Sequence, residues 1–245
     1  MTYPTIIEVL GRAEQGVTRP FRCRAEDGKL YYVKGKHASR RSQICEWVAG
    51  NIGLAFGLPI APFTIVDVPA ELVEMLPIDQ QELGTGPAFG SLALSHALEV
   101  SWPQVGSVPI ETRSDILVFD WWVRNGDRSL TALGGNPNLL WNPTTERVVV
   151  IDQNQAFDDA FNPAEFFFSH IFRAEWGRIV ADCVTVATYE QRLEAAIAQF
   201  TVACDSCPEE WWWVDEGVPT TFDADKILSQ LTAFSQADGF WGGAK

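Results

Sequence analysis

The polar segment RNGDRSLTALGGNPNLL, residues 124–140, constrains what this chain can fold into more than any other feature. It contains an aspartate, two arginines and three asparagines, yet apolar runs flank it. These are DILVFDWWV (115–123) before it and RVVVIDQNQAF (147–157), with a second aspartate, after it. Polar groups beside buried segments need partners, because burying them unpaired is costly. We therefore expect these acids and amides to line a cleft.

The chain is long and apolar enough to bury a sizeable core. Its 245 residues are 47% hydrophobic, which fits one large domain or two lobes. It lacks a run of about 18 apolar residues, so a membrane span is not expected. The N-terminal residues MTYPTIIEVLGRAEQG lack the basic and apolar stretches of a secretory signal. We therefore expect the protein in the cytoplasm.

The charge and the cysteines exclude some classes of function. With 32 acidic against 18 basic residues, the formal charge is −14. A surface this acidic repels nucleic-acid phosphates and anionic lipids, so direct binding to either is not expected. The five cysteines are an odd number for a disulfide framework, and CDSC (204–207) has no second pair to complete a zinc site. Reduced thiols are the favoured interpretation.

The N-terminal part predicts a hairpin followed by a helix. PFRCRAEDGKLYYVKG (20–35) alternates in polarity on both sides of a DG turn. Its Lys34 is then either an exposed edge residue or a charge directed into a cleft. The helix is expected within residues 39–62, with a serine as its N-terminal cap and Gly57 and Pro59 at its end. The two candidate caps are Ser39 and Ser42.

One face of that helix carries Glu46 together with three glycines, which are Gly50, Gly53 and Gly57. Each glycine costs a helix about 1 kcal/mol relative to alanine, which a solvated face has no reason to accept. The pattern indicates close approach of another backbone. Glu46 would then need a cation, for which Lys34 is the nearest candidate. The alternative is a surface glutamate on a weak helix.

The middle of the chain predicts short elements separated by turns. We expect short strands in FTIVDVP (63–69) and ELVEML (71–76), a flexible connector in GTGPAFGS (84–91), and a helix in LALSHALEV (92–100). A second helix, over residues 111–123, is apolar nearly all round and should be buried.

The buried helix has one acidic residue that requires a partner. Asp120 lies within its apolar run, and Arg124 or Arg128 could donate to it. Beyond residue 160 the chain is expected to be mostly helical.

The polar segment has the residue types of a phosphoryl-transfer site. If residues 138–141 pair with 148–151, Asn138 and Asp152 come together, and amide and carboxylate oxygens are suitable ligands for Mg²⁺. Asp127, on the NGDR turn, is placed to accept a proton from a hydroxyl. With a distant lysine held by a glutamate, these are the groups that phosphoryl transfer uses.

The order of these motifs resembles the HipA-like branch of the protein-kinase-like superfamily, which is related to the phosphatidylinositol kinases. The motifs are YYVKG, CEWVAGNIGLAFGLPIAP, RNGDR…NPNLL and VIDQNQAF, in that order. The resemblance implies an α+β, two-lobed, protein-kinase-like fold. A small β-rich N-lobe would comprise residues 1–90, and a larger, mostly helical C-lobe residues 91–245.

The resemblance also implies roles for individual residues, with ATP and Mg²⁺ as cofactors. Lys34 would contact the ATP phosphates, and Glu46 would hold Lys34 in place. Asp127 would orient or deprotonate the acceptor, and Asn138 and Asp152 would bind the metal. Gly16 and Thr18 would lie in the loop that covers the phosphates. That loop, EQGVTRPF, has one glycine where the family has several. The catalytic loop is long and offers Asn136 as well as Asn138. We prefer Asn138 because an apolar strand follows it directly.

Three classes of function are compatible with this set. The first is a kinase that phosphorylates a protein Ser or Thr hydroxyl, which we favour. The second is a lipid or small-molecule kinase, although the acidic charge disfavours anionic lipid surfaces. The third is a nucleotide-binding pseudokinase, which the complete set of polar residues disfavours. Expected partners are ATP and a protein or small-molecule acceptor. The acceptor and any antitoxin-like partner cannot be read from the sequence.

Overall fold

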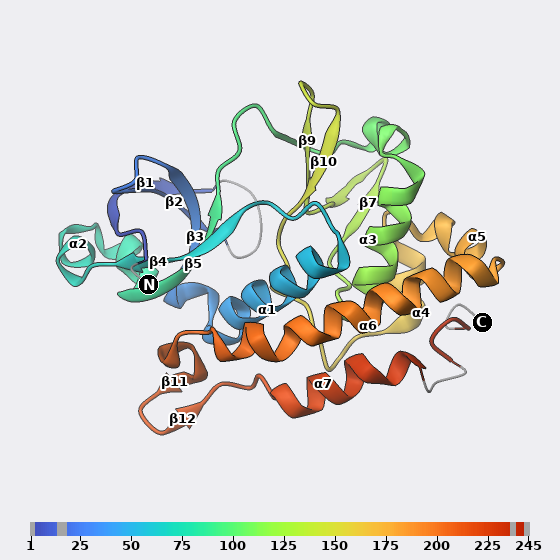
Figure 1. The fold of residues 1–245 in the computed structure, drawn as a ribbon. Helices are drawn as coiled ribbons and strands as arrows, with labels where there is room; N and C mark the ends of the chain where they lie inside the picture. The colour runs from blue at the N-terminus through green and yellow to red at the C-terminus, as the bar shows by residue number, and fades with distance from the viewer. Residues whose placement is uncertain (1–2, 14–18, 236–238, 243–245) are drawn as a thin grey trace. The chain divides into compact units, whose positions relative to one another are not determined.

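The computed structural model describes residues 3–13, 19–235 and 239–242. Contacts divide the chain into two compact units, each built from separate segments. The first unit takes its residues from 1–47, 61–95 and 207–222, and the second from 48–60, 96–206 and 223–245. Figure 1 shows the elements of both.

The first unit contains an antiparallel five-stranded sheet with the order β1-β2-β3-β5-β4. The predicted hairpin forms its centre, since Phe21 pairs with Val33 across β2 and β3. Phe21 and Val33 are both fully buried, which the alternating polarity of the two segments requires. The strands are β1 Ile6–Arg12, β2 Phe21–Ala25, β3 Leu30–Lys34, β4 Phe63–Val68 and β5 Gly86–Leu92.

The flexible connector predicted over residues 84–91 was wrong. This segment forms β5, which lies between β3 and β4 in the sheet. Its Gly90 packs closely against β4, because a Cβ there would lie 2.8 Å from Val66 Cγ1. The glycine therefore permits close side-chain packing within the sheet.

Two neighbouring predictions were also wrong. Residues 71–76, expected as a strand, lie in helix α2 (Ala70–Met75) and its C-terminal cap, with Glu71 in a first turn that favours acids. A 3-10 helix, η2 (Ile78–Leu83), follows. Residues 92–100, expected as a helix, contain the end of β5 and the short strand β6 (Leu98–Glu99), which pairs with β9.

Helix α1 (Arg40–Phe56) begins and ends where the sequence predicts, after a 3-10 turn, η1 (Lys36–Ala38). Ser39 Oγ accepts a hydrogen bond from the Ser42 backbone N–H at 3.2 Å, so Ser39 is the cap. Gly57, with φ of +99°, takes the left-handed conformation that ends many helices. The residues of α1 up to Trp47 belong to the first unit and the rest to the second.

The second unit is mostly helical, as expected (Figure 1). Helix α3 buries most of its residues, including Asp120, and the long α6 packs against α7. Two small sheets accompany the helices, with the orders β10-β9-β6 and β7-β8. The helices are α3 Ile110–Trp122, α4 Pro163–Ser169, α5 Trp176–Val180, α6 Cys183–Asp205 and α7 Ala224–Thr232; the strands are β7 Ser129–Thr131, β8 Gly134–Asn136, β9 Leu139–Asn142 and β10 Arg147–Val150.

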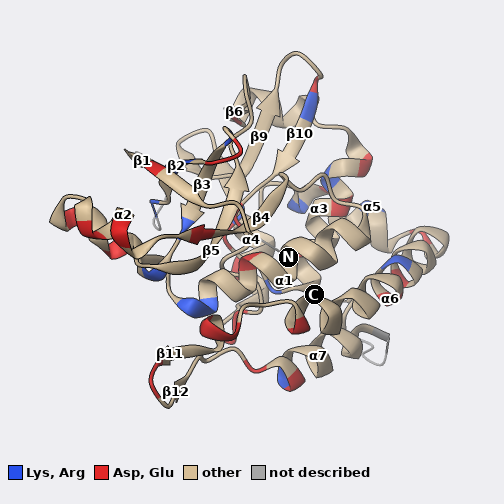
Figure 2. Ribbon diagram, turned by 60° about the vertical axis from the view of Figure 1, so that its left-hand side comes forward, with Lys and Arg blue, Asp and Glu red and all other residues tan. Residues whose placement is uncertain are grey.

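Short elements complete the described chain. They are the 3-10 helices η3 (Trp102–Ser107), η4 (Arg173–Glu175), η5 (Glu209–Trp212) and η6 (Ala233–Ser235), and a small hairpin of β11 (Trp213–Asp215) and β12 (Val218–Pro219). None of the helices in the described residues combines the length and apolar character that a membrane span requires. Figure 2 shows acidic positions on several elements, among them α2. The fold is therefore α+β, with a small antiparallel sheet near the N-terminus and a helical C-terminal part, as predicted.

Candidate active site

Lys34 and Glu46 form a buried ion pair within the first unit. Lys34 is the last residue of β3, and its Nζ lies 2.5 Å from Oε1 of Glu46 on α1. The side chains are 7% and 3% exposed, so neither residue is the solvated one that the alternatives described. Gln43, one turn before Glu46, donates from Nε2 to the Lys34 carbonyl at 2.7 Å. Strand and helix thus hold the ammonium group in a fixed place.

At Gly53 and Gly57, two of the three glycines near Glu46, side chains lie where we predicted the close approach of another backbone. A Cβ on Gly53 would lie 3.1 Å from Ile60 Cδ1 and 3.2 Å from Phe119 Cζ. A Cβ on Gly57 would lie 3.5 Å from Arg192 Nη2. Apolar and guanidinium groups therefore fill the space that the missing side chains leave.

Asp127 is held by two asparagine side chains within the second unit. Asn136 and Asn138 each donate from Nδ2 to the same oxygen, Asp127 Oδ2, at 2.9 and 3.0 Å. The structure thus brings both candidate asparagines of the long loop to one carboxylate. Both side-chain amides therefore bond to one oxygen of the carboxylate, Oδ2.

Asp152 is brought to the same place by a hairpin. Strands β9 and β10 pair antiparallel with Leu139 opposite Val150, as the sequence predicts. The next backbone bond, from Ile151 N–H to the Asn138 carbonyl at 3.1 Å, extends the pairing to the residue before Asp152. The loop that carries Asn138 and the strand end that carries Asp152 therefore meet.

The backbone at this meeting point is unusual. Asn138 and Asp152 have φ angles of +48° and +58°, in the left-handed region. Asn and Asp tolerate this region better than most residues, because their short side chains bond to nearby backbone groups. Such conformations cost free energy and concentrate at functional sites. Asn138 and Asp152 are two of eight described non-glycine residues with positive φ, and they lie at the same end of the β9–β10 hairpin.

The electrostatics of the group favour a cation. Burial raises the pKa of Asp127, the negative charge of Asp152 raises it further, and the hydrogen bonds from Asn138 and Asn136 oppose the rise. A positive charge close to the two carboxylates would stabilise the ionised form of Asp127.

The chemistry of the donors indicates which cation fits. Within residues 3–13, 19–235 and 239–242, no three His, Cys, Asp or Glu side chains form a cluster that could hold a metal. Asp152 offers a carboxylate and Asn138 an amide oxygen, and both are hard oxygen donors. Mg²⁺ is commonly bound through one or two carboxylates, with substrate phosphates and waters completing the shell. The residues therefore fit Mg²⁺ and do not fit a metal that needs a complete protein cage.

A protein-family model described as HipA-like kinase matches residues 6–244. The chain belongs to the HipA-like kinase family. Among solved structures, it resembles the crystal structure of the Helicobacter pylori proinflammatory kinase CtkA, with a TM-score of 0.55 and 11% sequence identity. The match covers 99% of this chain and 96% of that one. At this identity the likeness shows a shared fold. No curated protein matches the chain.

Two of the predicted site residues of this HipA-like kinase lie outside the described residues. They are Gly16 and Thr18, both assigned to the phosphate-covering loop. Their roles stay predictions.

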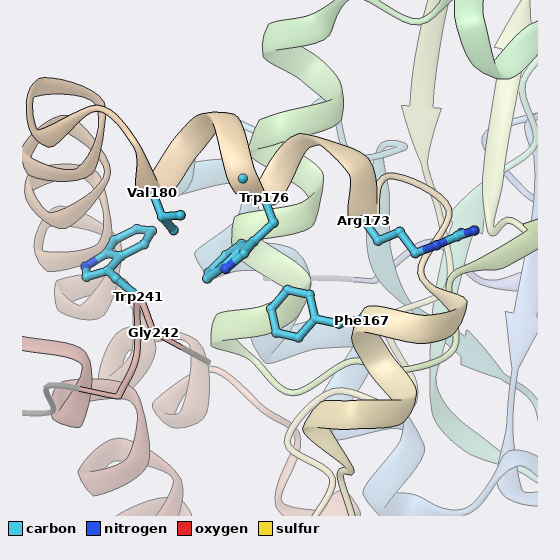
Figure 3. A pocket seen from close by; sticks show the side chains of 7 residues that line it. Phe167, Arg173, Trp176, Val180, Trp241 and Gly242 are labelled. Atoms are coloured by element: carbon cyan, nitrogen blue, oxygen red, sulfur yellow. The ribbon is translucent and has the colours of Figure 1, made fainter. Parts of the chain in front are cut away.

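A cavity of about 420 Å³ lies elsewhere in the second unit of the HipA-like kinase (Figure 3). In the figure the rings of Phe167, Trp176 and Trp241 gather around it, and the Arg173 guanidinium points away from them. The full lining is Phe167, Arg173, Trp176, Gly177, Val180, Trp241 and Gly242. None of the predicted site residues lines this cavity, so it is separate from the candidate active site.

Sequence reasoning left one choice open and missed one residue. Asp120 pairs with Arg128, and not with Arg124, at 2.7 Å from Nε to Oδ2. His170 is also bonded to Asp120, although 50 residues separate them. Its burial in the apolar stretch PAEFFFSHIF was the available signal, but no spacing rule connects it to Asp120.

Proposed function

We propose that this HipA-like kinase is an ATP- and Mg²⁺-dependent phosphotransferase that acts on a Ser or Thr hydroxyl of a protein. The observation that carries the proposal is the arrangement of Asp127, whose Oδ2 is held by two amides beside Asp152. A carboxylate fixed through one oxygen presents the other in a constant direction, which is what a base or positioning residue needs.

In the proposed reaction, the acceptor hydroxyl oxygen forms a bond to the γ-phosphorus of ATP. The bond from that phosphorus to the β–γ bridging oxygen breaks, and ADP leaves with the electron pair. The hydroxyl proton passes to Asp127 Oδ1. The raised pKa of Asp127 makes it a stronger base than an exposed aspartate, which favours this transfer.

Asn138 and Asp152 are the residues that would hold Mg²⁺. When bound, the ion offsets negative charge on the phosphates, which is the main requirement of phosphoryl transfer. Asp152 supplies a carboxylate at the rigid end of a strand, and Asn138 donates its Nδ2 hydrogen to Asp127, so its amide oxygen points elsewhere. In this proposal the Asn138 Nδ2 group bonds to Asp127, and the Asn138 amide oxygen binds Mg²⁺.

Lys34 is proposed to contact the ATP phosphates, with Glu46 and Gln43 as its supports. A lysine ordered before the nucleotide arrives loses less conformational entropy on binding than a mobile one. Gly16 and Thr18 are proposed to belong to the loop that covers the phosphates, and we place the protein in the cytoplasm. We propose residues 1–90 and 91–245 as the two lobes.

A protein is the favoured acceptor because the formal charge of −14 disfavours an anionic lipid surface. A small-molecule acceptor is the runner-up. Incubating the protein with labelled ATP, Mg²⁺ and a lysate of its own host should label a protein band. The Asp127→Asn variant should retain ATP binding and lose the label. A wild-type protein that binds ATP and transfers to no protein, small molecule or water would be a pseudokinase.

A further inference from the structure

The most deeply buried charges described in the second unit lie directly behind the candidate active site. Arg128 and Asp120 are both 0% exposed, and His170 is 1% exposed. Buried ion pairs are poor stabilisers, since apolar side chains of the same volume often serve a fold equally well. Because these residues lie beside Asp127, we considered a role for them other than stabilising the fold.

Arg128 connects helix α3 to the far end of the catalytic loop. Its Nε donates to Asp120 Oδ2 at 2.7 Å, and its Nη1 donates to the carbonyls of Pro137 and Asn138 at 3.2 and 2.6 Å. Asp127 immediately precedes Arg128. One guanidinium thus holds both ends of the segment 127–138 against one buried carboxylate.

His170 fixes that carboxylate from the other side. Its Nδ1 accepts a hydrogen bond from the Phe172 backbone N–H at 3.1 Å, so in the neutral ring Nε2 carries the hydrogen. Nε2 lies 3.0 Å from Asp120 Oδ2, as a donor in this tautomer. The Ile171 N–H also donates to the Arg128 carbonyl at 3.0 Å. The main chain around His170 therefore holds the same segment.

The backbone of Asn138 shows why such support is needed. Its φ of +48° is less favourable than an ordinary loop conformation, so the loop would relax without an outside contact. The bond from Arg128 Nη1 to the Asn138 carbonyl, at 2.6 Å, supplies one. When Asn138 moves, its Nδ2 leaves Asp127.

We propose that Asp120, Arg128 and His170 are positioning residues, which hold Asp127 and Asn138 in the arrangement that phosphoryl transfer uses. The proposal rests on the proposed function. It assigns no contact with ATP or the acceptor to the three residues. It separates them from an ordinary structural ion pair by requiring that their loss affect turnover more than nucleotide affinity.

The test is the Arg128→Lys variant, which keeps the positive charge and removes the planar guanidinium with its several hydrogen-bond donors. One ammonium group cannot reach Asp120 and two carbonyls together. We expect kcat to fall about 10²-fold, as a misplacement of about 1 Å can cause, with a smaller loss of ATP affinity. Hydrogen–deuterium exchange should rise in residues 127–138. This second readout needs no activity.

Arg192→Lys is the matched control. Arg192 also bridges an aspartate and a carbonyl, with Nη1 2.6 Å from Asp115 Oδ1 and Nη2 2.9 Å from the Phe56 carbonyl. It has no contact with the segment 127–138 among the bonds that the described residues show. It should leave kcat and exchange in 127–138 near the wild-type values. If Arg128→Lys fails to fold, Asp120→Asn is the second variant, with the same expectations at smaller amplitude.

Each outcome decides the proposal. A selective loss of kcat with faster exchange in 127–138 supports it. Wild-type kcat in Arg128→Lys, or an equal loss in Arg192→Lys, overturns it. A wild-type protein without any transfer activity overturns the proposed function instead, and exchange in the loop then decides whether the three residues position it.

Discussion

Asn138 donates a hydrogen bond from its side-chain Nδ2 to Asp127 Oδ2 at 3.0 Å, although 11 residues separate the two in the chain. The bond joins the residue proposed to receive a proton to one proposed to hold the metal. A change at Asn138 should therefore affect both roles. Asp127 and Asp152 are proposed for different roles, so substitutions at the two positions should have different effects.

The first prediction is that Asp127→Asn loses transfer without losing stability. Transfer should fall by about 10²–10⁴-fold, while ATP affinity is kept. The folded-state pKa of Asp127 is raised above its unfolded value, mainly by burial, so its stabilising effect is present at low pH and is lost as pH rises through that pKa. At neutral pH the carboxylate opposes folding, and asparagine should leave Tm unchanged or higher. Phosphate-transfer assays check the loss of activity, and calorimetric unfolding checks the Tm. An Asp127→Asn variant with wild-type transfer would refute the mechanism.

Lys34→Ala should weaken ATP binding and destabilise the protein. Removing one member of a buried ion pair typically costs about 3–5 kcal/mol, because the other charge stays buried. Lys29→Ala is the control, since Lys29 pairs with Asp27 at the surface and is 60% exposed. Such exposed pairs contribute about 0–1 kcal/mol. Denaturant unfolding and titration calorimetry measure the two effects, and unchanged ATP affinity in Lys34→Ala would remove Lys34 from the site.

Glu46→Gln should lower turnover more than stability. The amide keeps the shape of the side chain and a hydrogen bond to Lys34, but it loses the charge that orients the ammonium group. The Gln43 contact to the Lys34 carbonyl remains and holds strand β3 against α1. Steady-state kinetics and thermal unfolding, compared in one buffer, decide this. A loss of Tm with unchanged kcat would assign the pair to folding alone.

Asp152→Asn should abolish the Mg²⁺ dependence of ATP binding. Asparagine tolerates the left-handed backbone at this position, so the change removes a charge without adding strain. Titration calorimetry with Mg²⁺ and with a chelator gives the difference in ATP affinity. The wild type should show a large difference and the variant a small one. Equal metal dependence in the two proteins would place the metal elsewhere.

The last prediction concerns pH and His170. Burial lowers its pKa, and the nearby charges of Arg128 and Arg173 add to this, against the opposing effect of Asp120. A histidine with a lowered folded-state pKa stabilises the fold above its unfolded pKa of about 6.5, and this stability is lost as pH falls. His170→Gln should therefore show a shallower decline in the free energy of unfolding below about pH 6.5. If the free energy of unfolding falls equally steeply with pH in both proteins, His170 is not a neutral side chain in the folded state.

Some elements could be predicted from sequence patterns between residues close together in the chain. The hairpin of β2 and β3 follows from alternation around Asp27 and Gly28, and α1 from the Ser39 cap and the Gly57 stop. The pairing of β9 with β10 follows in the same way from two apolar runs around a turn. Each of these depends on neighbours within about 20 residues, which a sequence pattern can show.

The remaining features depend on distant neighbours. Strand β5 was mistaken for a connector because its glycines acquire meaning only when β4 lies beside them, as at Gly90 and Val66. The choice of Arg128 over Arg124 depends on how the chain turns after α3. His170 bonds to Asp120, although 50 residues separate them in the chain. The residue types of the site could be read in advance, but not the packing that holds them.

The left-handed backbone at Asn138 and Asp152 restricts the substitutions open to this site. β-Branched side chains are strained in that conformation, so valine, isoleucine or threonine would meet a backbone penalty at either position. Glycine and the exchange of Asn with Asp carry the smallest penalty. Either change would alter a proposed metal ligand with little cost to the fold.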